Sequence, residues 1–359
     1  MTGKERLEAV FRGEEPDHIP WAPLLDDFFM RSLPADKKGI SIIELLRELE
    51  ADVLLRHIPA PYANLQTGPV TAKSERVGDT ASTRTVWSTP WGTLTEVDRA
   101  VASAETSFKS EFPVKKLEDW DVMARIWENA EVQGDFAQTD AVVQSIGEDG
   151  LATISGPPAP LVGILNYRDA QEAIFDLVDS TGYMLDISAR IHEKLKVVYE
   201  RLCQGPVDTI ISYSANLTTR LISPAIAREF ALPNYRDYAR ICHRHGKKLI
   251  IHTCGDVAAL LPIFKEAGLD GVDSLSLPRL GDTTMTMIRK ELGDEFTVIG
   301  GVNPVVLSMG SLWELEEHVR GFFDDLSTRK GLILCVSDAT PYGTPLENLR
   351  LVSRLVREL

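Results

Sequence analysis

The sequence predicts an α/β fold: a closed (βα)8 TIM barrel with an N-terminal extension and an inserted hairpin. First, the second half of the chain alternates short apolar runs with helical stretches, about six times in roughly 200 residues, which favours a closed barrel over an open sheet. Second, the apolar runs are continuous, which is typical of parallel strands buried on both faces. Third, 359 residues, of which 44% are hydrophobic, suffice for one large core with room for extensions.

In the second half, the predicted strands are short apolar runs, and the predicted helices carry apolar residues that recur on one side. The strands are expected at residues 153–155, 209–213, 249–252, 271–275, 296–299 and 332–336. The helices are expected at residues 169–178, 183–202, 224–245, 260–267, 284–292, 312–326 and 346–359.

The first half is less regular. Helices are expected at 3–11 and 41–48, and apolar runs at 19–24, read as the first barrel strand, and at 51–55. The stretch 85–97 holds Trp87, Trp91 and Gly92 among threonines, which indicates an inserted hairpin, and the acidic stretch 117–129 predicts a helix outside the barrel. We therefore expect a single domain over 1–359, with a decorated insertion at about 75–130.

The charge balance excludes two classes of partner. There are 38 Lys and Arg against 53 Asp and Glu, a formal net charge of −15, and there is no basic run. Nucleic acid and anionic membrane surfaces need clustered cations, so neither is expected as a partner. No apolar stretch reaches the ~18 residues of a membrane span, and the charged, amphipathic residues 1–10 do not look like a signal peptide. These features predict a cytoplasmic protein.

Four cysteines are too few for a disulfide framework, which leaves buried thiols or metal ligands. Cys203 and Cys242 lie in predicted helices without metal-ligand spacing, and we interpret both as packing residues. His243 and His245 flank an arginine at a polar helix end, where cations are favoured, and we interpret them as solvated.

Polar residues that follow predicted strands are the candidates for chemistry, because reactive groups of βα barrels lie at strand ends. His252 and Cys254 alternate with a threonine, so in an extended chain they point to the same side. Imidazole and thiolate placed in this way make half of a tetrahedral zinc site, although such a pair also arises by chance. Cys335 and Asp338 end the last apolar run, where Cys335 is also readily explained as a small core residue.

Three further residues are candidates for substrate binding. Tyr213 and Asn216 follow the run 209–213, and Trp21 lies in the run 19–24. Each of them has packing as its alternative role.

Several short motifs now suggest a family. They are HTCG at 252–255, GGVNP at 300–304 and TPLEN at 344–348, together with the opening GKERLEAVFRGEEPDHIPW and LISP at 221–224. With these motifs, which run almost from end to end, the sequence resembles the uroporphyrinogen decarboxylase superfamily. The resemblance implies a (βα)8 barrel, in agreement with the strand and helix pattern.

The superfamily includes decarboxylases, which carry an Arg-Gln-Ala-Gly-Arg stretch after the first strand and a His six residues before the final Thr-Pro. Here the corresponding stretch at 24–30 is LLDDFFM, and Asp338 takes the place of the His. An acidic mouth repels a polycarboxylate substrate. A metal-independent decarboxylase is therefore the alternative rather than the leading hypothesis, and a non-catalytic binding barrel is a third one.

The other branch resembled here contains zinc-dependent methyltransferases that work with corrinoid proteins. Their signature is His-x-Cys-Gly plus a second Cys about six residues before the final Thr-Pro. His252 and Cys254 match it, whereas Asp338 holds the place of the second Cys and Cys335 comes three residues earlier. An odd separation points the two side chains to opposite faces, so either one is the third ligand. The alignment favours Asp338, an oxygen ligand that zinc accepts.

The resemblance implies a methyl transfer between a small methylated donor and the cobalt of a corrinoid. His252, Cys254 and Asp338 would be the catalytic residues around Zn²⁺. The sequence contains no D-x-H-x-x-G element of a corrinoid-binding domain, so a separate corrinoid protein is the expected partner. Aromatic residues near the N-terminal loops suggest an aryl methyl ether as the donor, while methanol, methylamine-derived groups and thiols stay open. The oligomeric state also stays open, a homodimer included.

Overall fold

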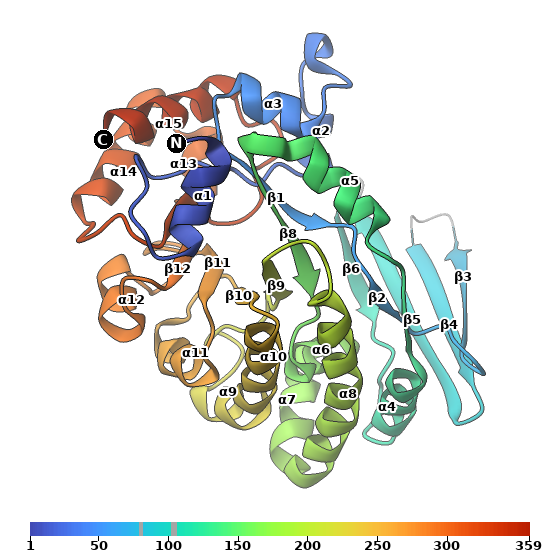
Figure 1. Cartoon of the computed structure of the whole chain (residues 1–359). Coiled ribbons are helices and arrows are strands. Elements are labelled where there is room, and N and C mark those ends of the chain that lie inside the picture. Colours follow the sequence, from blue (N-terminus) through green and yellow to red (C-terminus); the bar gives the residue numbers. More distant parts are fainter. Residues whose placement is uncertain (79–81, 102–105) are drawn as a thin grey trace.

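Seven parallel strands form one curled sheet at the centre of the molecule, with helices packed around it (Figure 1). The structure is a computed structural model and describes residues 1–78, 82–101 and 106–359. In sheet order the strands are β1 (Val53–Ile58), β8 (Gly150–Gly156), β9 (Thr209–Tyr213), β10 (Lys248–His252), β11 (Gly271–Leu275), β12 (Thr297–Val302) and β13 (Leu332–Val336). Every residue of β11, β12 and β13 is buried, as expected for parallel strands covered on both faces.

An irregular segment around Trp21 takes the eighth position of the barrel. Trp21 forms an isolated parallel bridge with Leu334 of β13, and Leu334 N donates to Pro20 O. On the other side, the N–H of Asp52, just before β1, donates to Trp21 O. The run 19–24 was expected as a regular strand, but prolines at 20 and 23 lack the N–H groups that a ladder needs. The predicted TIM-barrel-like architecture is confirmed, with seven regular strands and this bridge.

Most helices lie where the apolar periodicity places them, whereas α2, α5, α6 and α13 were not predicted. They are α1 (Gly3–Phe11), α2 (Asp27–Arg31), α3 (Ile42–Glu48), α4 (Asp119–Asn129), α5 (Ala137–Ile146), α6 (Pro160–Tyr167), α7 (Ala170–Asp179), α8 (Thr181–Leu202), α9 (Pro224–Phe230), α10 (Leu232–Arg244), α11 (Leu261–Ala267), α12 (Met285–Leu292), α13 (Pro304–Met309), α14 (Leu312–Asp324) and α15 (Leu346–Glu358). In α15, Leu349, Val352 and Val356 recur at spacings of three and four and are all buried. A capping box between Ser311 and Glu314 starts α14.

One predicted helix is divided in two. The stretch 224–245 was expected as a single helix, but α9 ends at Phe230 and α10 begins at Leu232. Pro233 explains the break, because its ring clashes with the carbonyl group four residues earlier and it offers no N–H. Cys203 and Cys242, interpreted as packing residues, are both buried, and their sulfur atoms lie 3.8 Å apart between α8 and α10.

The insertion beside the barrel is larger than the predicted hairpin (Figure 1). It is an antiparallel sheet in the order β3 (Thr71–Val77), β4 (Ser82–Thr89), β5 (Gly92–Val101) and β6 (Thr106–Glu111). The hairpin expected at 85–97 is confirmed as the pair β4–β5, and it has one more strand on each side. Two short strands, β2 (Tyr62–Asn64) and β7 (Glu131–Gln133), pair with each other. In the chain, β2 precedes the inserted sheet and β7 follows it. Among the described residues, no helix is both long and apolar enough to cross a membrane.

Candidate active site at the barrel mouth

His252 and Cys254 meet where β10 ends. His252 is the last residue of β10 and is almost completely buried, and the sulfur atom of Cys254 lies 3.8 Å from His252 Nε2. A tetrahedral zinc ion with ordinary Zn–N and Zn–S bonds holds its nitrogen and sulfur ligands ~3.6 Å apart. Gly255, with φ of +80°, lets the chain turn away directly after Cys254. The pair therefore has the spacing of two ligands on one zinc ion.

Asp273 of β11 orients the imidazole of His252. His252 Nδ1 lies 2.7 Å from Asp273 Oδ2, and both side chains are buried. An ionised carboxylate only accepts hydrogen bonds, so Nδ1 carries the proton and Nε2 presents its lone pair on the side of Cys254. Metal-binding histidines commonly have such a carboxylate behind them. Asp273 is not among the residues predicted from the sequence, although a charged residue within an apolar strand is a signal for such a role.

Arg56 of β1 extends this chain of contacts to Cys335. Its Nη1 donates to Asp273 Oδ1 at 2.5 Å, and its Nη2 donates to the sulfur of Cys335 at 2.9 Å. Burial raises the pKa of Asp273, but the charge of Arg56 and the hydrogen bond from His252 outweigh it and hold that pKa well below its usual range. Burial also raises the pKa of the Cys335 thiol. The buried network thus runs from His252 through Asp273 and Arg56 to Cys335.

The two alternatives for the third ligand, Asp338 and Cys335, differ in their surroundings. Asp338 is exposed just after β13, where its Oδ1 accepts from Ala339 N at 2.8 Å. Burial, with the charges of Asp338 and Asp273, raises the pKa of Cys254 to about 12. Within the described part of the chain, no three His, Cys, Asp or Glu side chains lie close enough together to hold a metal ion. Asp338 and Cys335 therefore both stay predictions as ligands.

The three predicted substrate residues have different surroundings. The ring of Tyr213, at the end of β9, stacks on that of His252 with centroids 4.4 Å apart, and Tyr213 is 49% exposed. Asn216 follows on the next loop and donates from Nδ2 to Asn166 Oδ1 at 2.9 Å. Trp21 is fully buried, so its side chain packs in the core rather than lining an open mouth.

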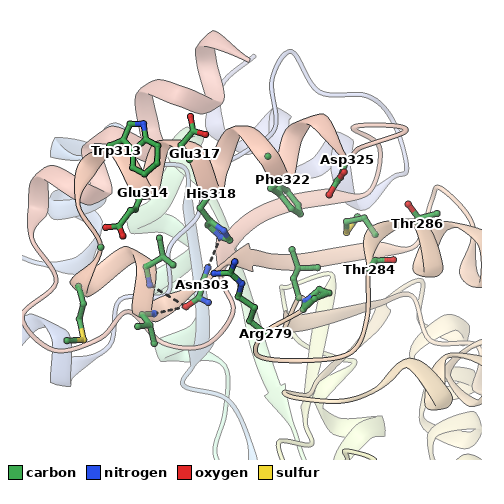
Figure 2. A pocket seen from close by; sticks show the side chains of 18 residues that line it. Arg279, Thr284, Thr286, Asn303, Trp313, Glu314, Glu317, His318, Phe322 and Asp325 are labelled. Carbon is green, nitrogen blue, oxygen red and sulfur yellow. Dashed lines mark hydrogen bonds between the residues drawn. The ribbon is translucent and has the colours of Figure 1, made fainter.

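A groove of about 950 Å³ lies apart from these residues, between α12, α13 and α14 (Figure 2). Figure 2 shows Arg279, Asn303 and His318 together on its wall, and His318 Nε2 accepts from the backbone N–H of Asn303. Trp313 is 69% exposed beside it. None of the residues in the His252 network lines this groove.

Comparisons with known proteins agree with this fold. Residues 190–359, which include His252, Cys254, Asp273 and Asp338, match the family Uroporphyrinogen decarboxylase (URO-D). A curated relative from Methanosarcina mazei, methylated-thiol--coenzyme M methyltransferase, is 28% identical over 141 residues, which are 39% of this chain and 35% of the relative. The match thus spans about a third of that relative's length.

A solved structure described as a methyltransferase from Methanosarcina mazei shares the fold. It aligns with a TM-score of 0.65 over 100% of this chain and 98% of that chain, at 13% identity. Residues 190–359 are therefore similar to the uroporphyrinogen decarboxylase family, and the curated relative that matches part of this chain is a methyltransferase.

Proposed function

We propose that this protein is a zinc-dependent methyltransferase that moves a methyl group between a small methylated donor and the cobalt of a separate corrinoid protein. The observation that carries the proposal is the pair His252 Nε2 and Cys254 Sγ, 3.8 Å apart and backed by Asp273. The relatives support it as well, since both are methyltransferases. The proposal places the protein in the cytoplasm, where its thiols stay reduced.

The residues at the barrel mouth would have different roles. His252 and Cys254 would hold the zinc ion, which when bound supplies Lewis acidity to the heteroatom of the methyl donor. Asp273 keeps the proton on His252 Nδ1, so that Nε2 stays free to bind. Tyr213 covers one face of the His252 ring and excludes water from that side. The mouth must stay wide enough for a partner to present its cobalt.

We expect Asp338, rather than Cys335, to complete the ligand set. Cys335 is already engaged by Arg56, whereas Asp338 is exposed and its charge acts on the Cys254 thiol. Asp338→Ala is expected to lower zinc affinity by at least about 10- to 100-fold. Cys335→Ser, which keeps an acceptor for Arg56, should change it less than about threefold. Competition with a chromophoric chelator measures the zinc affinity of both variants. A larger loss of affinity in Cys335→Ser than in Asp338→Ala would make Cys335 the third ligand.

For the donor, we propose an aryl methyl ether. Aromatic side chains flank the mouth: Tyr213 is half exposed, and Tyr342, after β13, packs against Phe28 of α2 with ring centroids 4.8 Å apart. Exposed rings of this kind favour a flat aromatic substrate. A methylated thiol, as in the name of the curated relative, is the competing donor.

The experiment is cobalt methylation with a panel of donors. Zinc-loaded protein is mixed with reduced cobalamin and, separately, methoxybenzoates, methanol, methylamine and methylated thiols. We expect the spectrum of methylcobalamin with the methoxybenzoates, and none with a zinc-free sample. Release of CO₂ from a carboxylated substrate without cobalamin would instead favour the decarboxylase alternative.

A further inference from the structure

His57, near the end of β1, has a backbone conformation that is uncommon for residues other than glycine. Its φ is +62°, in the left-handed region, and the pairing of β1 with β8 shifts register between Leu55 and Ile58. Non-glycine residues in such regions persist only where the surroundings impose them, and they gather at functional sites. Strand irregularities beside active sites commonly turn a side chain into a new direction.

Here the irregularity directs an imidazole over the barrel mouth. His57 Nδ1 lies 2.5 Å from Ser155 Oγ at the end of β8, which fixes the ring. The ring stands edge-on to Tyr213, with centroids 5.5 Å apart and an interplanar angle of 83°, and its centroid lies 6.4 Å from that of His252. Among the described residues, Ser155 is the one hydrogen-bond partner of the imidazole, so Nε2 is available to a ligand.

Packing does not explain why this conformation is maintained. His57 is exposed, unlike its neighbours Arg56 and Ile58, so little apolar burial compensates for the strained backbone. Glycine adopts this φ without penalty, whereas histidine, like asparagine, enters the left-handed region more often than most residues but still at a cost. A histidine at this position is therefore better explained by what its ring binds than by what its backbone stabilises.

We propose that His57 is a substrate-binding residue, whose Nε2 hydrogen-bonds a carboxylate or hydroxyl oxygen of the methylated donor. This inference rests on the proposed function and goes further, because it assigns the polar end of the donor to the side of the mouth formed by β1 and β8. The aromatic part of the donor would then lie against Tyr213, with the methyl-bearing heteroatom toward Cys254.

The test combines ligand binding with thermal stability. In His57→Gly, Tm should rise by about 2 °C because the backbone strain is relieved. Binding of 4-methoxybenzoate alone, measured by calorimetry, should weaken about 10-fold because one hydrogen bond is lost. His57→Asn, which keeps a side chain but lacks the ring, should weaken binding similarly, and in turnover both variants should raise KM more than they lower kcat.

The matched control is His245→Asn. His245 pairs with Glu200 at the end of α10, away from the mouth, so binding should not change. A fall in Tm with unchanged affinity in both His57 variants would make His57 structural and overturn the inference, as would absence of 4-methoxybenzoate binding to the wild-type protein. Weakened binding without any cobalt methylation by the wild type would instead contradict the proposed function and leave the His57 assignment standing.

Discussion

His252→Ala is expected to lower the rate of cobalt methylation by about 1000-fold or more and to leave the purified protein with well below one zinc per chain. The imidazole is held by Asp273 with Nε2 on the side of Cys254, so its loss removes one of the two closely placed side chains that we propose as zinc ligands. Zinc content by elemental analysis and methylcobalamin formation by absorbance measure the two effects on the same sample.

The control for this variant is His243→Ala. His243 is an exposed histidine that pairs with Asp270 outside the mouth, and its loss should change neither zinc content nor rate. Trp313→Ala, in the groove of Figure 2, should also leave the rate unchanged. If His252→Ala kept both zinc and activity, the proposal that His252 and Cys254 bind zinc together would be wrong.

Arg56→Ala should produce the largest loss of stability, about 3–5 kcal/mol in the free energy of unfolding. The side chains of Arg56 and Asp273 are completely buried, so removing the guanidinium group leaves a carboxylate without its countercharge. It also leaves the sulfur of Cys335 without its donor. Chemical denaturation of the metal-free protein reports the change without interference from zinc binding.

A double variant separates the lost countercharge from lost packing. Arg56→Met with Asp273→Asn removes both charges while an amide oxygen still accepts from His252, and it should recover at least half of the stability lost in Arg56→Ala. As a surface control, Arg228→Ala breaks the exposed pair with Glu266 and should cost less than about 1 kcal/mol. A double variant as unstable as Arg56→Ala would show that the cost comes from packing and not from an unpaired charge.

Local patterns of sequence were sufficient to predict most of the barrel. Continuous apolar runs marked the buried strands. His252 and Cys254 are only two residues apart, so their proximity is a local feature, and their side chains lie 3.8 Å apart where β10 ends. The break between α9 and α10 could have been predicted too, since Pro233 is incompatible with the interior of a helix.

The rest of the site depends on contacts between distant parts of the chain. Arg56 and Asp273 are 217 residues apart and meet only when the barrel closes. The positive φ of His57 has no local signal, because a histidine does not mark the left-handed region as a glycine does. Trp21, chosen for its aromatic ring, is buried because its segment fills the eighth barrel position.

X-ray absorption at the zinc edge, on zinc-loaded wild-type protein and on Cys254→Ser, tests most directly whether Cys254 binds zinc. We expect one zinc per chain, with a sulfur ligand at about 2.3 Å and nitrogen or oxygen ligands at about 2.0–2.2 Å, and loss of the sulfur ligand in Cys254→Ser. A wild-type protein that binds no zinc, or a sulfur ligand that persists in Cys254→Ser, would contradict it.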